Sequence, residues 1–161
     1  MSDIAVVTGA SGGIGAAIAK LIHAKSEGQL TLCLHYNGNA VAANAVAAEI
    51  PGSFTVQANL STAEGRKTLL DAVLAKGNPF ALINNAGIDK PHEPALMVSE
   101  ASYEKIMDTN LRAPLFLMRD FAKEMARNES GVIVTKWRVS SCRARILTRW
   151  SARSSTVSIW P

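Results

Sequence analysis

Residues 8–15 read Thr8-Gly9-Ala10-Ser11-Gly12-Gly13-Ile14-Gly15, so that four glycines fall within seven residues. The stretch follows a short apolar run at 4–7 and precedes an Ala-rich segment with helical spacing, so it joins a buried strand to a helix. Gly9 permits a sharp turn, Gly13 leaves the backbone open to a ligand, and Gly15 lets the helix pack closely on the strand. Free N–H groups at the start of that helix favour an anion.

The spacing of this loop narrows the kind of anion site that it can form. It is Gly-x-x-x-Gly-x-Gly, and the Gly-x-Gly-x-x-Gly fingerprint is absent because Ile18 stands where its last glycine would. A P-loop is not indicated, because no Lys followed by Ser or Thr comes after the glycines. A tight strand–helix turn without a ligand is the alternative, although such a turn needs fewer glycines.

Short apolar runs alternate with helical segments along the chain. Strands are predicted at 4–8, 30–35, 54–57, 80–83 and 132–134, and helices at 14–25, 40–50, 62–76 and 99–128, the last broken near Pro114. Strict alternation implies a parallel sheet with right-handed crossovers and helices on both faces. We therefore predict a doubly wound, Rossmann-type α/β sheet, incomplete with about five strands in the order 3-2-1-4-5, over residues 1–134.

Two segments with asparagine occupy positions where a ligand could bind. Asn84-Asn85-Ala86-Gly87 follows the fourth predicted strand, and the carboxyl ends of parallel strands form the ligand crevice of such sheets. Turn formation is the alternative role for the two asparagines. Asn110 lies inside a predicted helix, where Asn is a mediocre former, so it is either functional or a solvent-facing residue.

Taken together, these motifs resemble those of the short-chain dehydrogenases/reductases. The family pattern Thr-Gly-x-x-x-Gly-x-Gly matches residues 8–15, its Asn-Asn-Ala-Gly matches 84–87, and its mid-helix Asn matches Asn110. The resemblance covers residues 1 to about 134, and within the family this sequence is most similar to the 3-oxoacyl-carrier-protein reductases. It implies NAD(P)H-dependent reduction of a carbonyl, or oxidation of the alcohol, with a small carbonyl or acyl substrate that the sequence does not identify.

The resemblance also implies roles for residues at the ends of the strands. The cofactor-binding residues so implied are Gly9, Ser11, Gly13, Ile14, Gly15, Tyr36, Asn37, Asn59, Leu60, Asn85, Ala86 and Gly87. The first five would hold the diphosphate, Asn59 and Leu60 the adenine, and the last three the ribose and nicotinamide, although the family usually has Asp in place of Asn59. Asn110 would hold a backbone carbonyl and a water in a proton relay, as the one catalytic residue that the match retains.

The end of the second predicted strand bears on the choice of cofactor. It reads Leu34-His35-Tyr36-Asn37-Gly38-Asn39 and holds no acidic residue. An acidic residue there would accept hydrogen bonds from the ribose of NAD and repel a 2′-phosphate. Its absence favours NADP(H), whereas the lack of an Arg or Lys to clamp the phosphate leaves NAD(H) open. We interpret His35 as a strand residue rather than a ligand.

The family's Tyr-x-x-x-Lys motif does not occur in these 161 residues. The two tyrosines are Tyr36 and Tyr103, and Ala40 and Met107 stand four residues after them. In the family, this Tyr donates a proton to the carbonyl oxygen and the Lys lowers its pKa. We therefore expect little or no dehydrogenase activity from the chain as written. The alternative function is a non-catalytic dinucleotide-binding or interaction module.

The composition changes abruptly near residue 135. Residues 130–161 carry six basic groups, no acidic group and all three tryptophans, whereas residues 1–129 have a net charge of −2. We interpret 135–161 as a basic tail rich in Trp, Arg and Ser that is disordered or out of frame, which favours a frameshifted, truncated or pseudogene product. Restoring one base at 135–137 permits the family's usual Thr-Asn-Met-Ala, but no single slip restores Tyr-x-x-x-Lys. A basic arm that binds nucleic acid is the competing interpretation.

The remaining features exclude several classes of protein. Apolar residues make up 48% of the chain and charged residues 19%, as in an ordinary globular domain. No run of about 20 uncharged apolar residues occurs, so no membrane partner is expected. Cys33 and Cys142 do not make a disulfide framework, which favours the cytoplasm. His92 and Glu93 have no Cys or second His nearby, so no metal site is expected. The family's homo-oligomer interface is expected to be largely missing.

Overall fold

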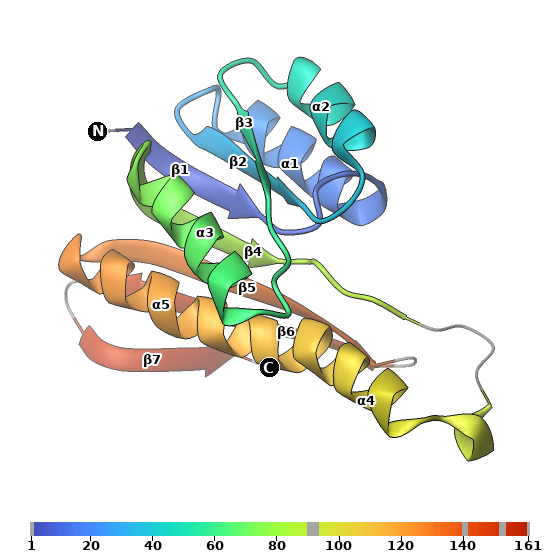
Figure 1. Ribbon diagram of the computed structural model, residues 1–161. Coiled ribbons are helices and arrows are strands. Elements are labelled where there is room, and N and C mark those ends of the chain that lie inside the picture. The colour runs from blue at the N-terminus through green and yellow to red at the C-terminus, as the bar shows by residue number, and fades with distance from the viewer. Residues whose placement is uncertain (1, 90–93, 140–141, 152–153, 161) are drawn as a thin grey trace.

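The computed structural model describes residues 2–89, 94–139, 142–151 and 154–160, with side chains placed up to Lys136 (Figure 1). One sheet of seven strands runs through the chain in the order β3-β2-β1-β4-β5-β6-β7. Its first five strands are parallel and are β1 (Ser2–Val7), β2 (Thr31–Tyr36), β3 (Phe54–Gln57), β4 (Gly77–Asn84) and β5 (Ser130–Val139). The predicted parallel sheet of order 3-2-1-4-5 is therefore confirmed.

Helices cover both faces of the parallel part of the sheet (Figure 1). On one face lie α1 (Gly13–Lys25) and α2 (Ala40–Ala48), and on the other α3 (Ala63–Leu74) and α5 (Ala113–Arg127). A short 3-10 turn (Ala95–Met97) precedes α4 (Glu100–Met107), which continues the line of α5 beyond the sheet. The arrangement is doubly wound, because each parallel crossover carries its helix to one of the two faces.

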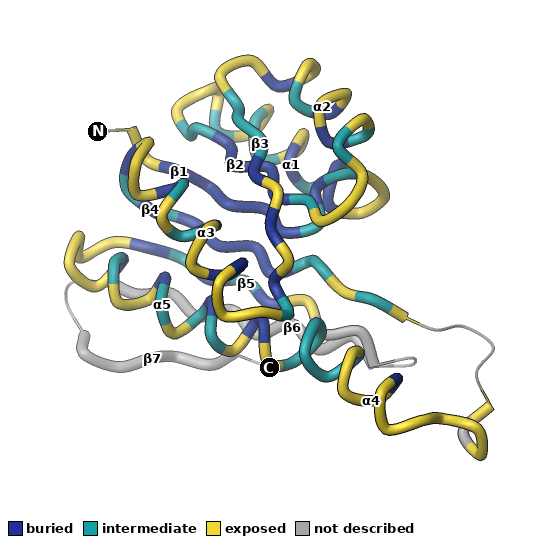
Figure 2. Tube along the Cα trace, viewed as in Figure 1, coloured by how far each residue is buried: buried dark blue, intermediate teal, exposed yellow. Residues whose placement is uncertain are grey.

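The core consists of two apolar clusters separated by the sheet. Ile4 and Val6 of β1 belong to the cluster under α3 and α5, whereas Ala5 and Val7 belong to the cluster under α1 and α2. Successive side chains of a strand point to opposite faces, so a strand that is covered on both sides needs a continuous apolar run. The central strands are accordingly the most deeply buried part of the trace (Figure 2).

A π-helical turn, Asp108–Arg112, joins α4 to α5. The break that was predicted near Pro114 is real, but it lies just before the proline, which occupies the first turn of α5. Proline fits there because the first N–H groups of a helix have no intrahelical partner. A π-helical turn holds one residue more than an α-helical turn, so it shifts the face that α4 presents relative to α5.

The segment after residue 134 was predicted to be a separate basic tail, disordered or out of frame, and that division stays a prediction. Strand β5 continues through this boundary to Val139, and antiparallel strands β6 (Cys142–Ser151) and β7 (Ser154–Trp160) follow it along the sheet edge. An edge strand such as β5 presents unpaired N–H and C=O groups, and an extended segment that follows it can pair with them. The proposed reading-frame slip stays a prediction.

No helix within the described ranges has both the length and the apolar character that crossing a membrane requires.

Candidate functional site

A cleft of about 410 Å³ opens at the carboxyl ends of β1, β4 and β5. It lies between the start of α1, the segment that leaves β4, and the junction of α4 with the π-helical turn. Its lining residues are Gly12, Ile14, Gly15, Asn85, Ala86, Gly87, Ile88, Asp89, Ile106, Met107, Asn110, Leu111 and Lys136. The cleft therefore brings together the glycine loop, the Asn-Asn-Ala-Gly motif and the mid-helix Asn, which are far apart in the sequence.

The glycines of residues 8–15 differ in how much space surrounds them. Gly9 has a φ of +67°, and a Cβ there would stand 2.9 Å from the Cα of Ala86. A Cβ on Gly15 would overlap the carbonyl oxygen of Gly9, so this position closes the contact between α1 and β1. Cβ atoms on Gly12 and Gly13 would instead meet open space. Gly9 and Gly15 are thus required for packing, whereas Gly12 and Gly13 leave the backbone uncovered at the start of α1.

Thr8 joins the ends of β1 and β4. Its Oγ1 accepts hydrogen bonds from the N–H groups of Asn85 and Ala86, both at 2.9 Å, and donates to the carbonyl of Ile83 at 3.3 Å. The side-chain amide of Asn85 donates in return to the carbonyls of Thr8 at 3.0 Å and Gly9 at 3.2 Å. These bonds fix the two loops that form the floor of the cleft.

His35 of β2 anchors the glycine loop from the other side. The side chain is 2% exposed; its Nδ1 accepts from the N–H of Gly9 at 3.2 Å, and its Nε2 lies 2.9 Å from the carbonyl of Ala58. This pattern requires the neutral ring with its hydrogen on Nε2, which donates to Ala58. Burial lowers the pKa of His35, which favours the same neutral form. His35 is a strand residue, as predicted, but its anchoring role was not foreseen.

Asn110 lies in the π-helical turn and clamps the segment after β4. Its Oδ1 accepts from the N–H of Ile88 and its Nδ2 donates to the carbonyl of Ile88, each at 2.8 Å. The amide thus holds a backbone carbonyl, as the resemblance implied, and it sits 3.3 Å from where a Cβ on Gly87 would be. This pairing explains an asparagine at a position where the helix would prefer another residue.

The other residues that the resemblance assigned to the cofactor do not line this cleft. They are Gly9, Ser11, Gly13, Tyr36, Asn37, Asn59 and Leu60. The first three belong to the glycine loop beside the cleft. Tyr36 and Asn37 lie at the end of β2, and Asn59 and Leu60 follow β3 along the same edge of the sheet.

Hydrogen bonds from its own side chains and from Arg66 hold the loop after β3 in place. The Oδ1 of Asn59 accepts from the N–H and the hydroxyl of Ser61, at 3.1 and 2.8 Å, and the side chain of Leu60 is buried. The guanidinium of Arg66 donates to the carbonyls of Leu60 at 2.8 Å and Ser61 at 3.1 Å, and lies 5.2 Å from the ring centre of Phe116. Arg66 therefore positions this loop, a role that no sequence pattern indicated.

Lys136, which falls within the predicted basic tail, lies in β5 and lines the cleft. The residue before it, Thr135, is buried and accepts a hydrogen bond from Asn84 at 3.2 Å. The alternation of side chains in β5 was the signal that could have placed Lys136. Gly12 was likewise missed, because it occupies an unspecified position of the family motif.

Within the described part of the chain, no three His, Cys, Asp or Glu side chains gather as metal ligands would. His92 and Glu93, which were weighed as candidates, lie outside the described residues.

Comparisons with known proteins agree with this geometry. A 3-oxoacyl-(acyl-carrier-protein) reductase FabG of Staphylococcus aureus (strain Mu50) is 33% identical over 139 residues, covering 83% of this chain and 55% of that protein. The 3-oxoacyl-(acyl-carrier-protein) reductase of Synechocystis sp. is 32% identical over 138 residues, covering 83% and 54%. The chain thus spans about half the length of the curated relatives that it matches.

A solved structure and a family model complete the comparison. The crystal structure of a metagenomic short-chain oxidoreductase in complex with NADP matches with a TM-score of 0.76 at 30% identity, covering 88% of this chain and 65% of that one. The model of the short chain dehydrogenase family matches residues 3–148. The fold agrees with the structural match over most of the chain, and the chain belongs to the short chain dehydrogenase family.

Proposed function

We propose that this chain binds NADP(H), in preference to NAD(H), in the cleft at the carboxyl edge of the sheet. The observation that carries the proposal is that the glycine loop and Asn85–Gly87 line one cleft, with His35 holding the loop and Thr8 holding Asn85 and Ala86. The preference for NADP(H) is supported by the absence of an acidic residue after β2 and by the relative that was solved with NADP.

The residues present fit a dinucleotide. Gly12 and Gly13 leave open space where a Cβ would approach a diphosphate, and the N–H groups at the start of α1 favour its charge. We assign Gly9, Ser11, Gly13, Ile14 and Gly15 to the diphosphate, and Asn85, Ala86 and Gly87 to the ribose and nicotinamide. Asn59 and Leu60 are assigned to the adenine, and Tyr36 and Asn37 to its ribose. When bound, such a cofactor supplies hydride transfer.

We also propose that these 161 residues reduce carbonyl compounds slowly or not at all. Asn110 uses both polar atoms of its amide on the backbone of Ile88, so it positions the cleft rather than supplying a proton. No Tyr-x-x-x-Lys occurs in the sequence to act as general acid. Loss of a positioned general acid costs about 10²- to 10⁴-fold in rate. A small carbonyl or acyl compound is the substrate class, as the names of the relatives suggest.

Two measurements on the full chain test these proposals separately. Titration with NADPH and with NADH, followed by the fluorescence of the reduced nicotinamide, should give saturable binding that is tighter for NADPH. Consumption of NADPH with a panel of ketones and oxo esters should stay near the background rate. Absence of saturable binding would contradict the first proposal, and rapid turnover would contradict the second. A non-catalytic binding module is the candidate favoured by binding without turnover.

A further inference from the structure

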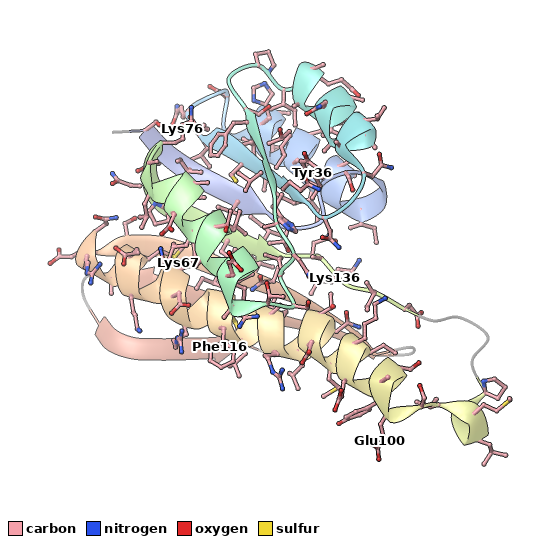
Figure 3. All side chains as sticks on the ribbon, in the orientation of Figure 1. Tyr36, Lys67, Lys76, Glu100, Phe116 and Lys136 are labelled. Atoms are coloured by element: carbon pink, nitrogen blue, oxygen red, sulfur yellow. The ribbon has the colours of Figure 1, made fainter. Side chains whose placement is uncertain are left out.

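Lys136 carries a positive charge at one end of the cleft. Among the lining residues that the structure describes, it is the one basic side chain, and it is exposed (Figure 3). Ile133 packs in the cluster under α3 and α5, whereas Val132 packs against the cluster under α1 and α2. Because alternate side chains of β5 share a face, Lys136 projects on the same face as Val132, toward α1. The direction of the side chain therefore follows from the strand itself.

The surroundings of Lys136 combine an apolar wall with a single opposite charge. Ile88, Ile106, Met107 and Leu111 line the same cleft, and Asp89 is its acidic lining residue. No ion pair joins Lys136 to an acidic group in the described part of the chain. An ammonium group beside apolar side chains, with no bound partner, favours a small ligand that has both an anionic and an apolar part.

Lys136 stands on a different strand from the one that leads into the glycine loop. Strand β4 lies between β1, which leads into that loop, and β5, which carries Lys136. Adjacent strands lie about 4.8 Å apart, so the backbones of β1 and β5 are about 10 Å apart across the sheet. We therefore place the anion beside Lys136 on the β5 side of Asn85–Gly87, and the test below distinguishes it from a phosphate of the cofactor.

We propose that Lys136 binds the carboxylate of a short oxo acid, so that the cleft prefers small anionic carbonyl compounds to neutral ones. The carbonyl part of this assignment rests on the proposed function, whereas the carboxylate rests on Lys136 alone. Asp89 opposes the same anion through its charge. Neutralising Lys136 weakens binding of the acid, and neutralising Asp89 strengthens it.

The test compares acetoacetate with its uncharged methyl ester on the full chain. Ligand-observed NMR gives the affinity of each compound, with and without saturating NADPH. The unmodified chain is expected to prefer the acid, and Lys136→Gln to bind it about tenfold more weakly, close to the ester. Lys136→Arg should keep the preference, and Asp89→Asn should increase it. Lys67→Gln, on the exposed face of α3, is the matched control and should leave the affinities for acetoacetate and for its ester unchanged. Far-ultraviolet circular dichroism confirms that each variant is folded.

The outcomes separate this inference from the proposed function. If the chain shows no preference for the acid, or if Lys136→Gln retains it, the assignment is wrong. If Lys136→Gln instead weakens NADPH and leaves acetoacetate unchanged, the anion is a phosphate of the cofactor, which also overturns it. If NADPH does not bind at all, the proposed function fails, and the comparison of acid with ester in the absence of NADPH still decides the role of Lys136.

Discussion

Replacing Gly12 by Asp should change stability and dinucleotide binding in opposite directions. Gly12 is the N-cap of α1, it makes no side-chain capping bond, and the first turn of the helix holds no acidic residue. Its φ of 167° is extended backbone that any residue adopts, and a Cβ there meets open space. Asp is a better N-cap than Gly by a few tenths of a kcal/mol, and its charge at a helix start contributes about 0.3–1 kcal/mol. The free energy of unfolding should rise by about 0.5 kcal/mol.

Binding should weaken, because the carboxylate of the Gly12→Asp variant competes with the diphosphate for the same end of α1. Two unit charges 4 Å apart repel by about 1 kcal/mol in water and by about 4 kcal/mol at an effective dielectric constant of 20. Gly12 is exposed, so the lower figure applies to each phosphate. A loss of about 1–2 kcal/mol follows, which is about a five- to thirtyfold rise in the Kd for NADPH.

The assay pairs urea denaturation with NADPH titration at low and high salt. Gly12→Asn is the matched control, since Asn caps a helix about as well as Asp and fills similar space without charge. The difference in Kd between the two variants should shrink as salt screens the repulsion. Equal binding of NADPH by Gly12→Asp and Gly12→Asn at low salt would refute the placement of the diphosphate at the start of α1.

Three further changes test how the cleft is held together. Burial lowers the pKa of His35 below its ordinary value of 6.5, so the unfolded chain takes up the proton first and stability should fall as the pH drops below about 6.5. Urea midpoints measured across pH should show this loss of stability in the unmodified chain and lack it in His35→Gln. Asn110→Leu removes both hydrogen bonds to Ile88 and should lower the unfolding free energy by about 1–3 kcal/mol while weakening NADPH binding, and an unchanged melting temperature would contradict this. Gly15→Ala places a methyl group against the carbonyl of Gly9, so calorimetry should show a loss of about 3 kcal/mol or failure to fold, in contrast to a mild effect at Gly12.

Much of the fold was predictable because buried parallel strands and their helices leave strong local signals. The apolar run at 4–7 and the glycines that follow it identify β1 and the turn into α1. The start of β4 was placed too late, because proline is rare in a central strand. Pro79 nevertheless lies within β4, next to the point where its register with β1 shifts between Ile4 and Ala5. Strands β6 and β7 were not predicted, because the apolar residues of their segment are scattered among Arg and Ser.

The site was predictable where glycine or asparagine stands in an unusual place, and not where ordinary residues act through long-range contacts. Gly15 and Asn110 could be singled out because each is a poor choice for its local structure. Thr8, His35 and Arg66 contact backbone groups of other loops, so their roles depend on the tertiary fold. Periodicity and spacing report local structure only, and for that reason they do not reveal such contacts.

The π-helical turn makes the number of residues between α4 and α5 a constraint in its own right. Deletion of a single residue within Asp108–Arg112 would convert the turn to an ordinary α-helical one. Every residue on its amino-terminal side would then rotate by about 100° about the helix axis relative to α5. Ile106 and Met107 would leave the wall of the cleft although neither had been replaced. Insertions and deletions should therefore be tolerated far less well in these five positions than substitutions.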